Sequence, residues 1–120
     1  MCGIAGYYDP KNDFSNDLKN NLRILENMIK SMKMRGPDDD SFSIIENCCL
    51  AHTRLSIIDI ETGSQPMKLR YNDNTYHIVF NGEIYNHRII KSELISLGYE
   101  FDTTSDVEVL LKAFIHWGIG

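Results

Sequence analysis

The sequence has few of the residues that a disulfide, a metal cluster or a membrane span would need. Only three cysteines occur, and two of them, Cys48 and Cys49, are sequence neighbours, which pair poorly. No CxxC pair is present and no histidine stands at a metal-ligand spacing from them, so no metal site is expected. No apolar run has membrane-spanning length, and the N-terminus lacks the regions of a signal peptide. These absences predict a cytoplasmic protein in which Cys48 and Cys49 are small apolar strand residues.

Dense basic clusters are missing as well. The formal net charge is −5 and the lysines and arginines are scattered, so neither a nucleic acid nor a membrane is an expected partner. The content of 42% hydrophobic and 24% charged residues is typical of a globular protein. A chain of 120 residues is long enough for one modest domain with its own core.

Short apolar runs and helical periodicities follow one another along the chain. Strands are predicted at 3–8, 42–46, 48–52, 56–60 and 76–80. Helices are predicted from 15 to about 34, from about 86 to 98, and from Ser105 onward. Ser105 and Glu108 have the S-x-x-E spacing of a capping box, and Asn81 and Gly82 form a tight-turn signal. Many short strands with a few helices predict an α+β layered sandwich.

Cys2 is the most informative single residue. It follows Met1 directly, and a methionine before so small a side chain is normally removed, which leaves Cys2 at the N-terminus. One residue then carries a thiol nucleophile and a free amine, whose pKa of about 7.7–8.0 makes it an available base. Activation of a nucleophile by the N-terminal amine is an established device of covalent catalysis. A cysteine at this position is inert in most proteins, so Cys2 alone leaves both interpretations open.

A series of short motifs accompanies this cysteine. They are MCGIAG at 1–6, RGPD at 35–38, AHTRLSIID at 51–59, QPM at 65–67, FNGEIYNH at 80–87 and TSDVEVLL at 104–111. In this order they resemble the glutaminase domain of glutamine-hydrolysing asparagine synthetases, which are class II amidotransferases. The likeness covers essentially the whole chain. CGI is shared by all class II amidotransferases, whereas RGPD, RLSIID and NGEIYNH favour the asparagine synthetase branch.

The resemblance implies the N-terminal-nucleophile hydrolase fold, an αββα sandwich. Family members continue with further strands and then an ATP-dependent synthetase domain. Residues 1–120 are therefore expected to be a partial glutaminase domain, truncated at the C-terminus, with the synthetase domain absent. ATP and Mg²⁺ are expected only in that absent domain, and no cofactor is expected in this one. The synthetase domain of the same polypeptide is the expected partner, and a homodimer is compatible with the resemblance.

The resemblance also implies the roles of the site residues. Cys2 is the expected nucleophile, and the Asn81 side chain and the Gly82 backbone N–H are the expected oxyanion donors. Arg54 is expected to bind the α-carboxylate of glutamine, and Glu83 and Asp106 are expected to bind its α-ammonium group. The residues expected to contact the substrate between them are Leu55, Ser56, Ile57 and Ile58. Other interpretations stay open: Asn81 and Gly82 as a type I′ hairpin turn, Arg54 as a solvated ion pair, and Asp106 as a helix-capping carboxylate.

These roles predict an enzyme that hydrolyses glutamine to glutamate and ammonia. In the intact protein the ammonia would serve ATP-dependent synthesis of asparagine from aspartate. One alternative is a glutamine-binding or structural module without turnover, because a retained Met1 would acylate the amine of Cys2. Another is a different class II amidotransferase, one that makes glucosamine phosphate or phosphoribosylamine.

Overall fold

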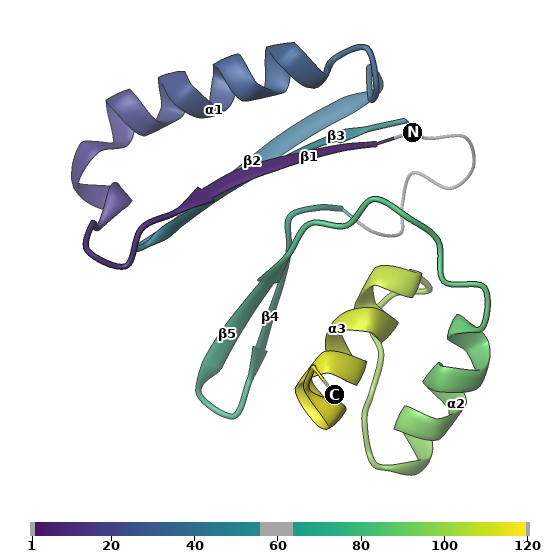
Figure 1. Ribbon diagram of the computed structural model, residues 1–120. Helices are drawn as coiled ribbons and strands as arrows, with labels where there is room; N and C mark the ends of the chain where they lie inside the picture. The colour runs from purple at the N-terminus through teal and green to yellow at the C-terminus, as the bar shows by residue number, and fades with distance from the viewer. Residues whose placement is uncertain (1, 56–63, 120) are drawn as a thin grey trace. The chain divides into compact units, whose positions relative to one another are not determined.

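The computed structural model describes residues 2–55 and 64–119. The chain divides into two compact units, Met1–Ile58 and Asp59–Gly120, which are described in turn (Figure 1). The predicted strand at 56–60 lies outside the described residues, as do Ser56, Ile57 and Ile58 of the expected glutamine site.

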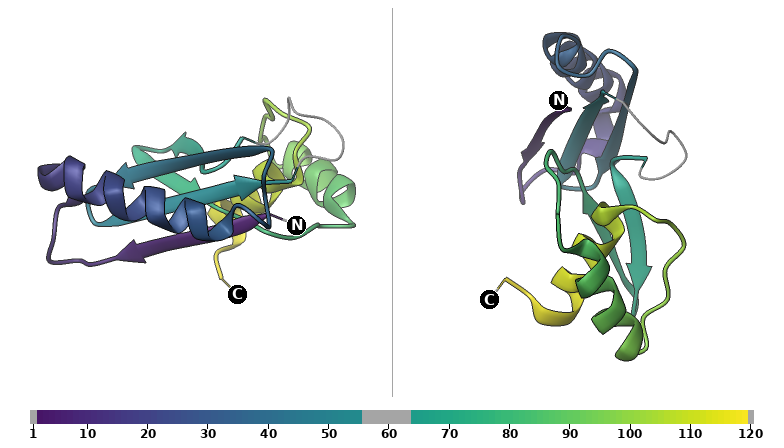
Figure 2. Two further views of the ribbon diagram at one scale, coloured as in Figure 1. Left: turned by 90° about the horizontal axis from the view of Figure 1, so that it is seen from above. Right: turned by 90° about the vertical axis from the view of Figure 1, so that its right-hand side faces the viewer.

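The first unit is an antiparallel sheet with one helix on it. Strands β1 (Gly3–Tyr8), β2 (Asp39–Ile45) and β3 (Cys48–Arg54) form a three-stranded sheet in the order β1-β3-β2. Helix α1 (Leu18–Met32), which follows a short 3-10 helix (Phe14–Asp17), lies along one face of that sheet (Figures 1 and 2). The core between them contains Leu25, Ile29, Cys49 and Ala51.

Local sequence accounts for these elements. β1 is confirmed at its predicted residues, and α1 confirms the helix predicted at 15–34, although α1 proper is shorter. Asp17 begins α1 by accepting a hydrogen bond from the backbone N–H of Asn20. The helix ends at Met32, whose carbonyl accepts from the N–H groups of Arg35 and Gly36. Pro37 follows, and a proline cannot continue a helix without losing a backbone donor.

The second unit is a β-hairpin followed by two helices. Strands β4 (Met67–Tyr71) and β5 (Asn74–Ile78) pair antiparallel, and helices α2 (His87–Ser96) and α3 (Asp106–Trp117) come after them. The Tyr76 ring on β5 meets the Phe114 ring on α3 edge to face, with 6.4 Å between centroids. Both predicted helices are confirmed, whereas β4 was not among the predicted strands.

The hairpin turn lies at Asn72 and Asp73. Their φ angles of 48° and 65° are the positive values that both central residues of a type I′ turn require. Asn81 and Gly82 have no positive φ, so their interpretation as a type I′ hairpin turn is wrong. The physical reason is that β5 already ends at Ile78 and the chain then leads into α2, leaving no second strand for such a turn to join.

The structure therefore confirms an α+β fold. Within residues 2–55 and 64–119, no helix combines the length and the apolar character needed to cross a bilayer.

Candidate active site

Strand pairing places Cys2 and Arg54 at the same end of the first sheet. Cys2 directly precedes β1, and the first residue of β1, Gly3, stands opposite Thr53 of β3. A Cβ atom on Gly3 would lie 2.6 Å from Thr53 Oγ1 and 2.9 Å from Met32 Cβ, so only glycine fits between β3 and α1 here. Cys2 is half-buried, and its carbonyl accepts a hydrogen bond from Arg35 Nε at 3.4 Å.

The RGPD segment supports the end of β3 that carries Arg54. The N–H of Asp38 donates to the Arg54 carbonyl at 3.0 Å, and Pro37 forms a parallel bridge with Arg54. A Cβ atom on Gly36 would lie 2.5 Å from Arg54 N and 2.7 Å from Thr53 O, so the loop approaches β3 as closely as a glycine allows. The sequence pattern gave RGPD no chemical role. The structure shows that this segment supports the end of β3 that carries Arg54.

The Asn81–Gly82 segment of the second unit is held by a residue that sequence reasoning left without a role. Gln65 Oε1 accepts a hydrogen bond from the backbone N–H of Phe80 at 2.6 Å, immediately before Asn81. Gly82 lies against the Phe80 ring, where a Cβ atom would come within 2.8 Å of Cζ. Asn81, Gly82 and Glu83 are themselves exposed to solvent. The QPM motif is the sequence feature that pointed to Gln65.

Asp106 joins two of the predicted glutamine-binding segments. It is the first residue of α3, and its Oδ2 accepts a hydrogen bond from the backbone N–H of Ile84 at 3.0 Å. This bond draws the chain after Gly82 and Glu83 to the N-terminus of α3, where the helix dipole favours a carboxylate. Asp106 thus bonds to another segment, while the cap of its own helix is Ser105, whose side chain accepts from Val107 N.

The predicted capping box at Ser105 and Glu108 is only half correct. The Ser105 half is present, but Glu108 does not bond back to the N–H of Ser105. Its Oε1 accepts from the N–H and the hydroxyl of Thr103, both at 2.7 Å, and its Oε2 accepts from the N–H of Asp102 at 3.0 Å. The N–H of Ser105 instead donates to Thr103 Oγ1 at 3.2 Å. Glu108 is therefore a residue whose partners the sequence pattern misassigned.

The pKa values of Cys48, which is half-buried, and of Cys49, which is buried, are both raised. Desolvation, together with the neighbouring Cys49, raises the pKa of Cys48. Burial also raises the pKa of Cys49, against the opposing effect of a hydrogen bond with Tyr7. A raised pKa disfavours the reactive thiolate, which fits their predicted role as apolar strand residues. Neither forms a disulfide.

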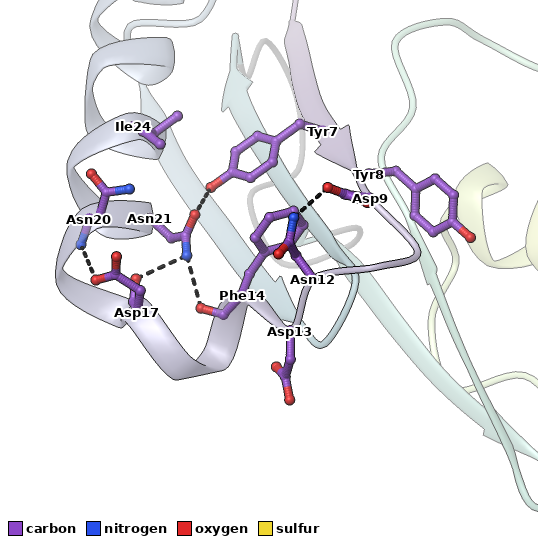
Figure 3. Close-up of a pocket in the computed structure, with 10 residues that line it drawn as sticks. All are labelled: Tyr7, Tyr8, Asp9, Asn12, Asp13, Phe14, Asp17, Asn20, Asn21 and Ile24. Carbon is purple, nitrogen blue, oxygen red and sulfur yellow. Dashed lines mark hydrogen bonds between the residues drawn. The ribbon is translucent and has the colours of Figure 1, made fainter.

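An acidic pocket of about 450 Å³ lies at the other end of β1 from Cys2. Figure 3 shows the carboxylates of Asp9 and Asp17 hydrogen-bonded to Asn12 and Asn20. Asp9 accepts from the Asn12 side chain and Asp17 from Asn20 N, while Asn21 accepts from the Tyr7 hydroxyl at 2.6 Å. The bonds of Asp17 and Asn21 lie at the start of α1, whereas the bond of Asp9 lies in the turn after β1. Across the described parts of the chain, no three His, Cys, Asp or Glu side chains are grouped so as to hold a metal ion.

The structure thus gathers the predicted site residues into two groups. Cys2 and Arg54 share one end of the sheet in the first unit, with Leu55 exposed directly after Arg54. The 81–84 segment meets Asp106 in the second unit.

Comparison with known proteins identifies the class. A model of the glutamine amidotransferase domain matches residues 1–120, so the chain belongs to the glutamine amidotransferase domain family.

The individual relatives that the chain matches are glutamine-hydrolysing asparagine synthetases. The chain is similar to asparagine synthetase [glutamine-hydrolyzing] 3 of Bacillus subtilis (strain 168), with 39% identity over 117 residues, 98% of this chain and 18% of the relative. It is 41% identical over 117 residues to asparagine synthetase [glutamine-hydrolyzing] 1 of the same organism, at the same coverage. Asparagine synthetase B [glutamine-hydrolyzing] of Escherichia coli (strain K12) is 39% identical over 115 residues, 95% of this chain and 19% of the relative. The chain therefore spans under a fifth of each relative, and the resemblance seen in its motifs is confirmed.

Proposed function

We propose that this chain is a glutaminase domain that hydrolyses glutamine to glutamate and ammonia. In the intact protein the ammonia is used for ATP-dependent synthesis of asparagine from aspartate. The observation that carries the proposal is the register of β1 and β3, which sets Cys2 beside the end of the strand that bears Arg54. Membership of the amidotransferase family and the named asparagine synthetase relatives support it.

Cys2 is the nucleophile once Met1 has been removed. Its own α-amine takes the thiol proton, and the sulfur attacks the side-chain amide carbonyl of glutamine. The amine then passes the proton to the departing nitrogen, the C–N bond breaks, and ammonia leaves a γ-glutamyl thioester on Cys2. Water adds to the thioester carbonyl, the C–S bond breaks, and glutamate and the free thiol result. No metal or cofactor enters this sequence of steps.

Asn81 and Gly82 stabilise the oxyanion that forms in both halves of the reaction. The donors are the Asn81 side-chain amide and the Gly82 backbone N–H. Their support is the local anchoring of this segment by Gln65 and the Phe80 ring, because a donor contributes most when it is held in place before charge develops.

The remaining residues bind the zwitterionic end of glutamine. The Arg54 guanidinium clamps the α-carboxylate, and backbone groups at 55–58 line the substrate. Glu83 and Asp106 bind the α-ammonium. Asp106 Oδ2 accepts a hydrogen bond from the Ile84 N–H. We assign the other oxygen, Oδ1, as the one that binds the ammonium group.

The αββα sandwich of this enzyme class is the fold that we propose for the domain. Helix α1 covers the face of its sheet that includes Ala5 and Tyr7. On the opposite face, Ile4 is 46% exposed and Tyr8 is 69% exposed, so a second sheet layer has apolar surface to cover there. We assign residues 1–120 to part of the glutaminase domain and ATP and Mg²⁺ to a separate synthetase domain. The three free cysteines support a cytoplasmic location.

The Cys2→Ala variant of the full-length protein tests the nucleophile. We expect it to lose glutamine-dependent ammonia release while still binding glutamine in calorimetry, because only the attacking sulfur is removed. Cys48→Ala, which changes a thiol outside the site, is the matched control and should keep its activity. Intact mass of the wild-type protein should show that Met1 is missing.

A normal rate of ammonia release from Cys2→Ala would refute the role of Cys2. A wild-type protein that keeps Met1 and binds glutamine without turnover would instead be the non-catalytic module. Formation of asparagine from aspartate, ATP and glutamine by the full-length protein tests the proposed product.

A further inference from the structure

The carboxylate of Glu108 organises the chain that leads into α3. The residue is only 4% exposed, and its two carboxylate oxygens accept hydrogen bonds from residues 102 and 103, as described above. Burial alone would raise the pKa of Glu108, but the hydrogen bonds from Lys112, Thr103 and the backbone outweigh it and lower the pKa. Glu108 is therefore a buried charge that the fold keeps ionised.

Lys112 completes the environment of this charge. It lies one helical turn after Glu108, and its Nζ donates to Glu108 Oε2 at 2.7 Å. Lys112 Nζ also donates to the Glu100 carbonyl and stands 4.4 Å from the centroid of the Phe101 ring. The pair thus holds residues 100–103 against α3. A buried pair of this kind is costly to break, because the remaining partner is left as an uncompensated charge.

A short relay of hydrogen bonds connects Glu108 to Asp106. Glu108 fixes Thr103, and Thr103 Oγ1 accepts from the N–H of Ser105 at 3.2 Å. Ser105 Oγ in turn accepts from Val107 N at 3.1 Å and begins the helix at Asp106. Asp106 Oδ2 then accepts a hydrogen bond from the backbone N–H of Ile84. Loss of Glu108 or of the Thr103 hydroxyl would therefore release the start of α3.

We propose that Glu108, acting through Thr103, is a positioning residue that sets the affinity of the site for the α-ammonium group of its substrate. This inference rests on the proposed function, in which Asp106 binds that ammonium. Glu108 touches no substrate atom itself. Its effect is therefore specific to one end of glutamine, whereas a general loss of stability would weaken every substrate alike.

The test compares glutamine with glutaramate, the analogue that lacks the α-ammonium group, in the full-length protein. The measured quantity is kcat/KM for glutamine divided by kcat/KM for glutaramate. We expect this ratio to fall about tenfold in Glu108→Ala and in Thr103→Val, the scale of one weakened charge-assisted hydrogen bond. Thr103→Ser keeps the hydroxyl and should retain the wild-type ratio. The matched control is Glu93→Ala, which removes an exposed carboxylate of α2.

Alkylation of Cys2 by iodoacetamide, followed by peptide mass spectrometry, should proceed at the wild-type rate in all variants. If Glu108→Ala does not fold, the Thr103→Val and Thr103→Ser pair decides the question. An unchanged ratio in Thr103→Val, or an equal fall for both substrates, overturns the positioning role alone. A wild-type protein with no preference for glutamine over glutaramate would overturn the proposed function as well.

Discussion

Replacing Gly36 with alanine should loosen the end of the strand that carries Arg54. The new Cβ atom would fall 2.5 Å from Arg54 N and 2.7 Å from Thr53 O, and real Cβ atoms do not come this close to other atoms. Both neighbours are backbone atoms of β3, so no side chain can rotate away to make room. The loop must move off the strand instead, and the Asp38 N–H to Arg54 carbonyl bond must lengthen.

Overpacking of this kind costs about 1–3 kcal/mol, and we expect the upper half of that range because backbone must shift. At 1.4 kcal/mol for each factor of ten, a cost of about 2–3 kcal/mol should make local opening about 30- to 140-fold more frequent. Hydrogen exchange measured by mass spectrometry on peptides covering 36–40 reports this opening directly. The KM for glutamine should rise in the same variant, since Arg54 loses its support.

Gly98→Ala is the contrasting variant. Gly98 has a φ of 101° and nothing within 4 Å of the position of a Cβ atom, so its cost is backbone strain alone. We expect faster exchange only near the end of α2 and no change in KM. If exchange at 36–40 in Gly36→Ala matched the wild type, the close approach of the RGPD loop to β3 would be disproved as the reason for glycine there.

Two further predictions concern the second unit. Asn81→Ala should lower kcat for glutamine hydrolysis by ~10²–10³ with little change in KM, as expected on loss of one oxyanion donor, and an unchanged kcat would remove that role. The folded-state pKa of Glu108 is lowered, so its contribution to stability is complete above the unfolded value of about 4.3 and is lost as the pH falls through the folded value. Protection factors of the Asp102 and Thr103 amides should therefore decline below about pH 4.3 in the wild type, but should stay low and independent of pH in Glu108→Gln. Equal wild-type protection at pH 6 and pH 3 would contradict this linkage.

Local pattern was sufficient for the elements whose cause is local. β1 begins and ends where its apolar run does, and α3 begins after Ser105 because the serine side chain caps it. β4 was missed although Met67–Tyr71 alternates apolar and basic residues, as a half-buried strand does. The turn that closes this hairpin lies at Asn72–Asp73, whereas the sequence pattern gave its turn signal at Asn81–Gly82.

The partners of Glu108 show where local pattern fails. The S-x-x-E spacing identified Glu108 as a capping carboxylate but paired it with Ser105. The preceding loop folds back onto α3 under the Lys112 pair, and this brings the N–H groups of Asp102 and Thr103 to the carboxylate first. Spacing along the chain does not encode how a loop folds back.

The amino-acid sequence by itself determined the order of the chemistry-bearing residues and the family to which the chain belongs, because both follow from residue identity at short range. The tertiary structure alone decided which of these residues meet. Strand register set Cys2 against the end of β3, and a hydrogen bond across 22 positions joined Ile84 to Asp106. Such contacts depend on strand pairing and loop closure between distant segments, and their free energies are shared by the whole fold rather than carried by any single motif.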